Sequence, residues 1–149
     1  MPKFRILFVV LALLILAQPV MAGVGTDKLE DQLKNYMNEI TLKVKSTDDP
    51  EQKRAILEET LLKIVETVET VEELPSIPER ERLLIARFKR DMQDKYDELN
   101  GLNGFERVAD EDLDVFTDYV MQELEQARNY ITMGLGVFIL LIILIILIA

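Results

Sequence analysis

Aspartates stand at three alternate positions, Asp110, Asp112 and Asp114, with the spacing that opens a calcium-binding loop. A complete loop of the helix–loop–helix type also has a glycine at its sixth position and a bidentate glutamate at its twelfth. Those positions hold Val115 and Met121 here. The run is therefore better explained as the acidic start of a helix, where the helix dipole favours negative charge.

Residue types that most often carry catalysis are missing from the chain. There is no cysteine and no histidine, which removes thiolate nucleophiles, the commonest general base and the commonest transition-metal ligand. The serines, Ser46 and Ser76, have no histidine to activate them. Close carboxylates such as Asp91 and Asp94 arise by chance in so acidic a chain. We expect no enzymatic activity, no cofactor and no metal.

One cluster of charge differs from its surroundings. The chain has 17 basic and 27 acidic residues and a net charge of −10, which disfavours nucleic acid as a partner. Within this acidic chain, five basic residues lie within eleven positions: Arg80, Arg82, Arg87, Lys89 and Arg90. Two interpretations stay open. The cluster pairs with acidic residues of neighbouring helices, or it forms a docking patch for an acidic partner.

The N-terminal part of the chain has the pattern of a signal peptide. Residues 1–22 combine a basic start, an apolar stretch from Ile6 to Ala17 and small residues near Ala22, after which we expect cleavage. The apolar stretch would rise only about 18 Å as a helix, less than the ~30 Å hydrocarbon thickness of a bilayer. A signal anchor that is kept is the alternative.

The C-terminal part is apolar over a greater length. Residues 131–149 carry no charge and would rise about 28 Å as a helix, which predicts a transmembrane helix over 132–149. A lipid-anchor attachment signal is the alternative, although its polar spacer is missing. Small residues at Thr132, Gly134 and Gly136 have a spacing at which two membrane helices can pair closely.

The charges of the N-terminus predict the orientation in the membrane. Lys3 and Arg5 favour the cytoplasmic side, so residues 23–131 are expected as an acidic extracytoplasmic domain. We expect a single-pass protein of a bacterial inner membrane, with this domain in the periplasm.

Between the two apolar ends, four segments show helical periodicity. They predict an all-α fold, an antiparallel up-and-down four-helix bundle over about 26–131. Asp49 is typical of a helix N-cap, Ser76–Glu79 of a capping box, and Asn100-Gly101 of a helix C-terminus. Phe105 is expected under the end of the bundle.

The fourth helical segment repeats apolar residues at spacings of three and four and then runs toward the predicted membrane helix without a break. The row consists of Leu113, Phe116, Val120, Leu124, Ala127 and Ile131. Rows of this kind pack against partner helices. The row is either the fourth side of the bundle core or a seam between copies of the chain.

Together these features predict a membrane-anchored extracytoplasmic helical protein that acts by interaction or as a scaffold. Its partner would be another membrane or envelope protein, a second copy of the chain included. The alternative function is a ligand-sensing bundle that signals through a membrane partner. Such a bundle would bind a small molecule between its helices, beside polar groups such as Tyr36, Tyr96 or Arg87.

Overall fold

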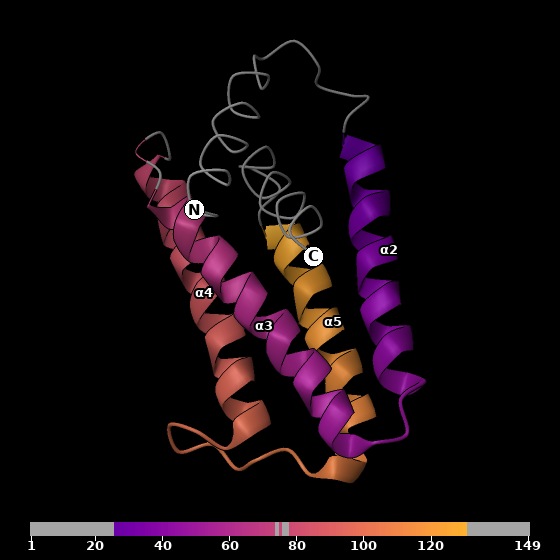
Figure 1. The fold of residues 1–149 in the computed structure, drawn as a ribbon. Helices are drawn as coiled ribbons and strands as arrows, with labels where there is room; N and C mark the ends of the chain where they lie inside the picture. Colours follow the sequence, from indigo (N-terminus) through magenta and orange to yellow (C-terminus); the bar gives the residue numbers. More distant parts are fainter. Residues whose placement is uncertain (1–25, 74, 76–77, 131–149) are drawn as a thin grey trace, which may run out of the picture.

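The protein is represented by a computed structural model, which describes residues 26–73, 75 and 78–130. In these ranges it contains helices and no β-strand, so the prediction of an all-α fold is confirmed. The elements are α2 (Thr26–Lys45), α3 (Pro50–Glu72), α4 (Glu79–Asn100), the short 3-10 helix η1 (Asp110–Asp112) and α5 (Leu113–Tyr130). Figure 1 shows the four α-helices as a bundle in which each helix runs antiparallel to the one before it.

The antiparallel order brings distant parts of the chain to the same end of the bundle. The start of α2, the end of α3, the start of α4 and the end of α5 lie at one end, which we call the terminal end (Figure 1). The turn between α2 and α3 and the loop of residues 101–112 lie at the other, which we call the loop end.

Both predicted membrane-associated segments fall outside the described residues. These are the signal peptide (1–22) and the transmembrane helix (132–149), including Thr132, Gly134 and Gly136. Among the helices of residues 26–130, none has both the length and the apolar character that crossing a bilayer requires.

The ends of the helices follow the predicted signals with one exception. Asp49 caps α3, because its carboxylate accepts a hydrogen bond from the Glu51 N–H at 3.1 Å. Gly101 ends α4 in the left-handed conformation, with φ of 68°. The capping box predicted for Ser76–Glu79 is wrong, because α4 begins at Glu79 with Pro78 at the N-cap and no side-chain cap. Proline is common at the start of a helix, because it has no backbone N–H to donate and its φ is fixed near the helical value.

The apolar core lies around α3, which packs against α2 and α5 and most extensively against α4. Its fully buried side chains come from all four helices: Val44 from α2, Leu57, Leu61 and Val68 from α3, Met92 and Leu99 from α4, and Leu113 and Val120 from α5. The spacing of Leu84, Phe88 and Met92 in the sequence predicts Leu84 as the inward residue near the start of α4. That prediction is wrong, because Ile85, 5% exposed, takes the inward position and Leu84 is only half-buried.

Three threonines are also buried in the bundle. Thr60, Thr67 and Thr117 each donate a hydrogen bond from the hydroxyl to the backbone carbonyl four residues earlier, at 2.7, 2.6 and 2.7 Å. These bonds satisfy the hydroxyl groups, so the threonines enter the core without an unpaired polar atom.

The loop of residues 101–112 is closed by backbone hydrogen bonds. The Leu102 N–H donates to the Asp97 carbonyl at 2.8 Å, and the Val108 N–H donates to the Glu98 carbonyl at 3.2 Å. Phe105 is 41% exposed, so the prediction that it lies under the bundle is wrong. Leu99 and Leu113 are fully buried at this end and fill the core in its place.

The two glycines of this loop differ in a way that can be tested. Gly101→Ala would force a left-handed backbone on alanine, at about 1–2 kcal/mol, and would place its Cβ 2.8 Å from the Arg107 Cβ. Gly104, at φ of 91°, has nothing within 4 Å of such a Cβ, so Gly104→Ala carries only the backbone penalty. We expect Gly101→Ala to lower the free energy of unfolding, measured in urea, more than Gly104→Ala. Equal losses would contradict the close approach.

Candidate interaction surface

The apolar row of α5 faces the inside of the bundle. Leu113 and Val120 are fully buried, and Phe116 and Leu124 are 6% and 7% exposed. All four belong to one cluster with core residues of the other helices. The side chain of Ala127, and Ile131 entirely, lie outside the described part. Because their own chain covers these four side chains, a second chain cannot pack on them while the bundle stays folded.

Two residues of the basic cluster join α4 to the end of α3. The Lys89 ammonium pairs with the Glu72 carboxylate, and Arg82 donates to the Glu72 carbonyl at 2.7 Å. Arg82 also lies 3.7 Å from the Glu79 carboxylate. For these two cations the structure favours the first interpretation, pairing with neighbouring helices, because both join α4 to the end of α3.

The other three cations point away from the core. Arg80, Arg87 and Arg90 are exposed, and the helical spacing places them on one side of α4 together with Leu83, which is 66% exposed. Neither Arg87 nor Arg90 forms an ion pair with any residue that the structure describes. We call these four residues the α4 outer face.

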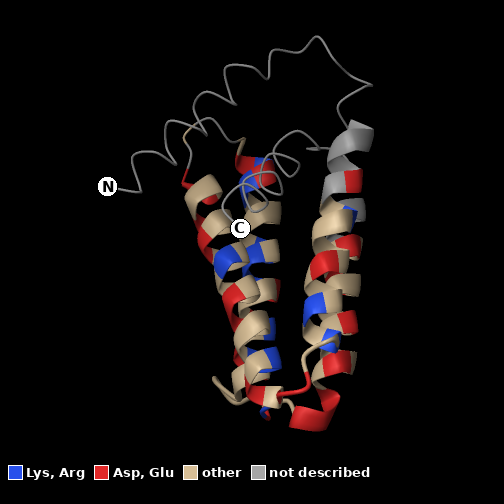
Figure 2. Cartoon of the chain, turned by 45° about the vertical axis from the view of Figure 1, so that its right-hand side comes forward, with Lys and Arg blue, Asp and Glu red and all other residues tan. Residues whose placement is uncertain are grey.

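The α4 outer face, with its three arginines, is part of a bundle that is acidic as a whole. Figure 2 colours Asp and Glu red, and red segments occur along the helices and at the loop end, where η1 lies. A guanidinium offers a rigid fork of donors that matches a carboxylate, and it binds less water than an ammonium group. Two unpaired arginines beside an exposed leucine can therefore bind a partner that presents carboxylates around an apolar side chain.

A second polar site, at the loop end, is internal. Arg54 of α3 is only 5% exposed, and its guanidinium donates to the Leu99 carbonyl, to the Val108 carbonyl at 2.7 Å and to the Asp110 carboxylate at 2.7 Å. This one side chain thus joins α3 to the end of α4, to the loop and to η1. The hydrogen bond from Arg54 is the largest of the effects that lower the pKa of Asp110, and desolvation acts in the opposite direction.

Arg54 belongs to none of the motifs described above, although the sequence carries a signal for its burial. Arg54 precedes Leu57, Leu61 and Ile64 at the same spacing of three and four, so it is an arginine at a core position. Asp97 of α4 is a similar case. It is 4% exposed and accepts hydrogen bonds from Asn103 at 2.7 Å and from Gln93 at 3.1 Å.

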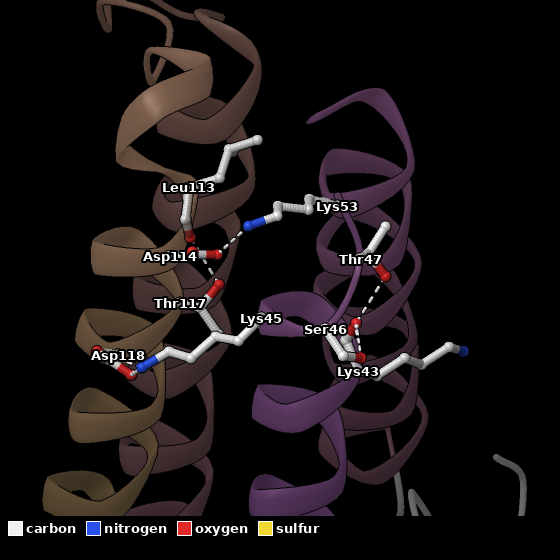
Figure 3. Close-up of polar contacts among 9 residues, drawn as sticks. All are labelled: Lys43, Lys45, Ser46, Thr47, Lys53, Leu113, Asp114, Thr117 and Asp118. Carbon is white, nitrogen blue, oxygen red and sulfur yellow. Dashed lines mark hydrogen bonds and ion pairs between the residues drawn. The ribbon is translucent and has the colours of Figure 1, made fainter. Parts of the chain in front are cut away.

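Two lysines bind α5 to its neighbours near the loop end. Figure 3 shows Lys45 of α2 directed at Asp118, with an N–O distance of 2.7 Å, and Lys53 of α3 directed at Asp114, at 2.5 Å. Asp110 and Asp114 of the predicted acidic helix start therefore both pair with cations of α3.

Lys95 forms a polar contact between α4 and α5. The Lys95 ammonium lies 4.2 Å from the ring centroid of Tyr119, donates to its hydroxyl at 3.0 Å and pairs with Glu98 at 2.9 Å. Burial acts to lower the pKa of Lys95, but the hydrogen bonds to Tyr119 and Glu98 outweigh it, so the pKa is raised. The lysine stays charged and holds the Tyr119 ring in place.

The polar residues considered for a ligand site do not share one location. Tyr36 and Tyr96 are half-buried and pack against the core, whereas Arg87 is exposed on the α4 outer face. Desolvation raises the pKa of Tyr36, with smaller contributions from Glu39 and Glu59. Arg87 therefore cannot line a site between the helices.

The Arg54 site makes a prediction about stability and pH. Arg54→Met leaves at least one buried carbonyl without a donor, which costs about 1–3 kcal/mol. Lys53→Met is the control, because its partner Asp114 is partly exposed and such pairs contribute about 0–1 kcal/mol.

The pH dependence follows from the lowered pKa of Asp110. The stability that the Asp110–Arg54 pair contributes is present above the unfolded pKa, about 3.9, and is lost as the pH falls through the lower folded pKa. We therefore expect wild-type protein to lose more stability than Arg54→Met or Asp110→Asn between pH 6 and pH 3, in urea unfolding. Identical losses in all three proteins would exclude the pair as a contributor.

Comparisons of the chain with models of protein families, with curated proteins and with solved structures gave no match. Inferences about function therefore rest on the sequence and structure of this chain alone. Among them, the α4 outer face combines exposed apolar surface with unpaired charge.

Proposed function

We propose that the chain is a membrane-anchored, extracytoplasmic helical interaction protein that docks an acidic partner on the α4 outer face. The observation that carries the proposal is the position of Leu83 among Arg80, Arg87 and Arg90, all exposed, with Arg87 and Arg90 unpaired within residues 26–130. An apolar anchor surrounded by charge is the composition of a specific protein–protein contact, in which the charges select the partner.

The charge of this face also selects against self-association. Two copies in one membrane that are related by a twofold axis along the membrane normal would place each residue near its own counterpart. Arg87 and Arg90 would then face arginines, and like charges oppose the contact. The partner we propose is therefore a different envelope protein, with carboxylates around an apolar patch.

The proposed anchor is the uncharged C-terminal segment, and its placement agrees with the topology of the bundle. α5 ends at the terminal end, so a membrane helix that follows it would hold this end near the bilayer and the loop end away from it (Figure 1). The predicted signal peptide and the acidic composition of residues 23–131 support the proposal of a periplasmic location on a bacterial inner membrane.

Membrane anchoring is tested by fractionation. We expect the full-length protein to stay with membranes in alkaline carbonate, because 19 uncharged residues favour insertion with no opposing charge. A version that ends after Tyr130 should be released into the soluble fraction. Release of the full-length protein by carbonate would contradict the proposed anchor.

Docking is tested by photo-cross-linking in cells. A photoreactive residue at Leu83 should form an adduct with another envelope protein, and Arg87→Glu with Arg90→Glu should reduce that adduct by roughly tenfold, the equivalent of about 1.4 kcal/mol.

Two controls are matched to this experiment. A photoreactive residue at Leu42 of α2, which is 69% exposed, tests whether exposure alone produces the adduct. Lys34→Glu with Lys43→Glu reverses two exposed charges on α2 instead. An adduct that forms equally from Leu42, or that both pairs of charge reversals reduce equally, would argue against the α4 outer face.

A further inference from the structure

A tripeptide is repeated where α4 ends and the loop of residues 101–112 begins. Leu99-Asn100-Gly101 is followed at once by Leu102-Asn103-Gly104. Asparagine is one of the thermolabile residues of proteins, and it is most prone to deamidation before a glycine, whose backbone nitrogen no Cβ shields. Since the two tripeptides are identical, a difference in their reactivity comes mainly from the fold.

The first asparagine is held by the end of α4. Asn100 is the last residue of the helix, is half-buried, and donates from its side-chain amide to the Tyr96 carbonyl at 3.0 Å. The nitrogen that would attack it, that of Gly101, donates to the Glu98 carbonyl at 3.4 Å. Deamidation at Asn100 therefore requires the last turn of α4 to unwind.

The second asparagine lies at the exposed tip of the loop. Asn103 and Gly104 both have a left-handed backbone, with φ of 51° and 91°. Their turn is closed by one hydrogen bond, from the Phe105 N–H to the Leu102 carbonyl at 2.9 Å. The Gly104 N–H forms no hydrogen bond with any residue that the structure describes. Exposed turns with few contacts open at low cost in free energy, so this nitrogen can reach the Asn103 side chain while α4 stays folded.

The Asn103 side chain also binds the loop to α4. Its amide donates a hydrogen bond to the Asp97 carboxylate at 2.7 Å, and Asp97 is only 4% exposed. Deamidation replaces the donating NH₂ group by a carboxylate oxygen, so two negative charges would meet where a hydrogen bond was. Like charges repel, and they do so more strongly where water is excluded. Because Asp97 is buried within α4 and the loop tip is exposed, the loop is the part that moves.

From these observations we propose that Asn103 is a site of spontaneous deamidation, and that the modified residue releases the loop from Asp97. The Gly104 nitrogen bonds to the side-chain carbonyl carbon of Asn103 and gives up its proton, and the side-chain nitrogen leaves as ammonia. Water then opens the cyclic imide at either of its two carbonyls, which gives aspartate or isoaspartate. Water is the co-reactant, so the reaction needs no enzyme.

The site is tested by incubating the full-length protein in detergent at mildly alkaline pH, followed by tryptic digestion and fragmentation mass spectrometry. The peptide from Tyr96 to Arg107 contains both asparagines, so one peptide reports on the two sites together. We expect deamidation at Asn103 to be roughly tenfold faster than at Asn100, since the hydrogen bonds of a helix end change a rate by at least that factor. In protein unfolded in urea, the two sites should react at similar rates.

Three results would each overturn the proposed site. They are equal rates at the two asparagines of the folded protein, a faster reaction at Asn100, and no reaction at Asn103 under conditions in which the unfolded chain reacts.

The release of the loop is tested with variants that do not depend on the slow reaction. We expect Asn103→Asp to lower the urea midpoint of unfolding more than Asn103→Ser, which removes the donor without adding a charge. Asn103→Asp combined with Asp97→Asn exchanges donor and acceptor, and the amide at position 97 keeps an oxygen that can accept from Gln93. The exchanged pair should therefore recover much of the lost stability. Equal midpoints for Asn103→Asp and Asn103→Ser, or no recovery in the exchanged pair, would contradict release from Asp97.

Discussion

The burial of one apolar row of α5 is the constraint on which the other features depend. A helix turns by about 100° per residue, so once Leu113, Val120 and Leu124 are buried against the other helices, every remaining position of α5 has a defined direction. The residues on the opposite side must then face outward. The same choice of face brings Asp114 and Asp118 toward lysines of α3 and α2. Core, ion pairs and outer surface of α5 are thus consequences of one packing contact.

At the loop end, a buried charge aligns three helices. Arg54 donates to the Leu99 carbonyl in the last turn of α4, where the helix dipole is negative, and Asp110 lies at the start of η1 and α5, where it is positive. Both groups therefore lie at the helix end that favours their charge. Burying a guanidinium costs free energy of desolvation that these contacts must offset, and its benefit is then one of specificity. With α3, the end of α4 and the start of α5 bound to one side chain, their relative register is restricted.

Much of the fold could be predicted from sequence because local signals and periodicity agreed. Asp49 and Gly101 end their helices for local backbone reasons, and the spacing of Leu57, Leu61 and Ile64 defines a buried side directly. The remaining features depend on packing between helices. Leu84 and Ile85 are both apolar and differ only by one helical step, so only the position of α3 decides which is buried. Arginine side chains are almost always exposed, so the burial of Arg54 was not predicted. Phe105 stays exposed because other apolar side chains fill the core at the loop end.

The helix pairs differ in how far apart in sequence their partners lie. α3 and α4 follow each other with a short connection and share the largest contact, whereas α2 and α5 meet through Lys45 and Asp118, 73 positions apart. Closing a long segment of chain costs more entropy than closing a short one, and distant contacts form more slowly. The hairpin of α3 and α4 can therefore assemble early, while α2, the first of the described helices in chain order, pairs only after α5, the last of them, is present. Until then one side of α2 and α3 stays open to water, and completion of the bundle coincides with the arrival of the residues that lead into the proposed anchor.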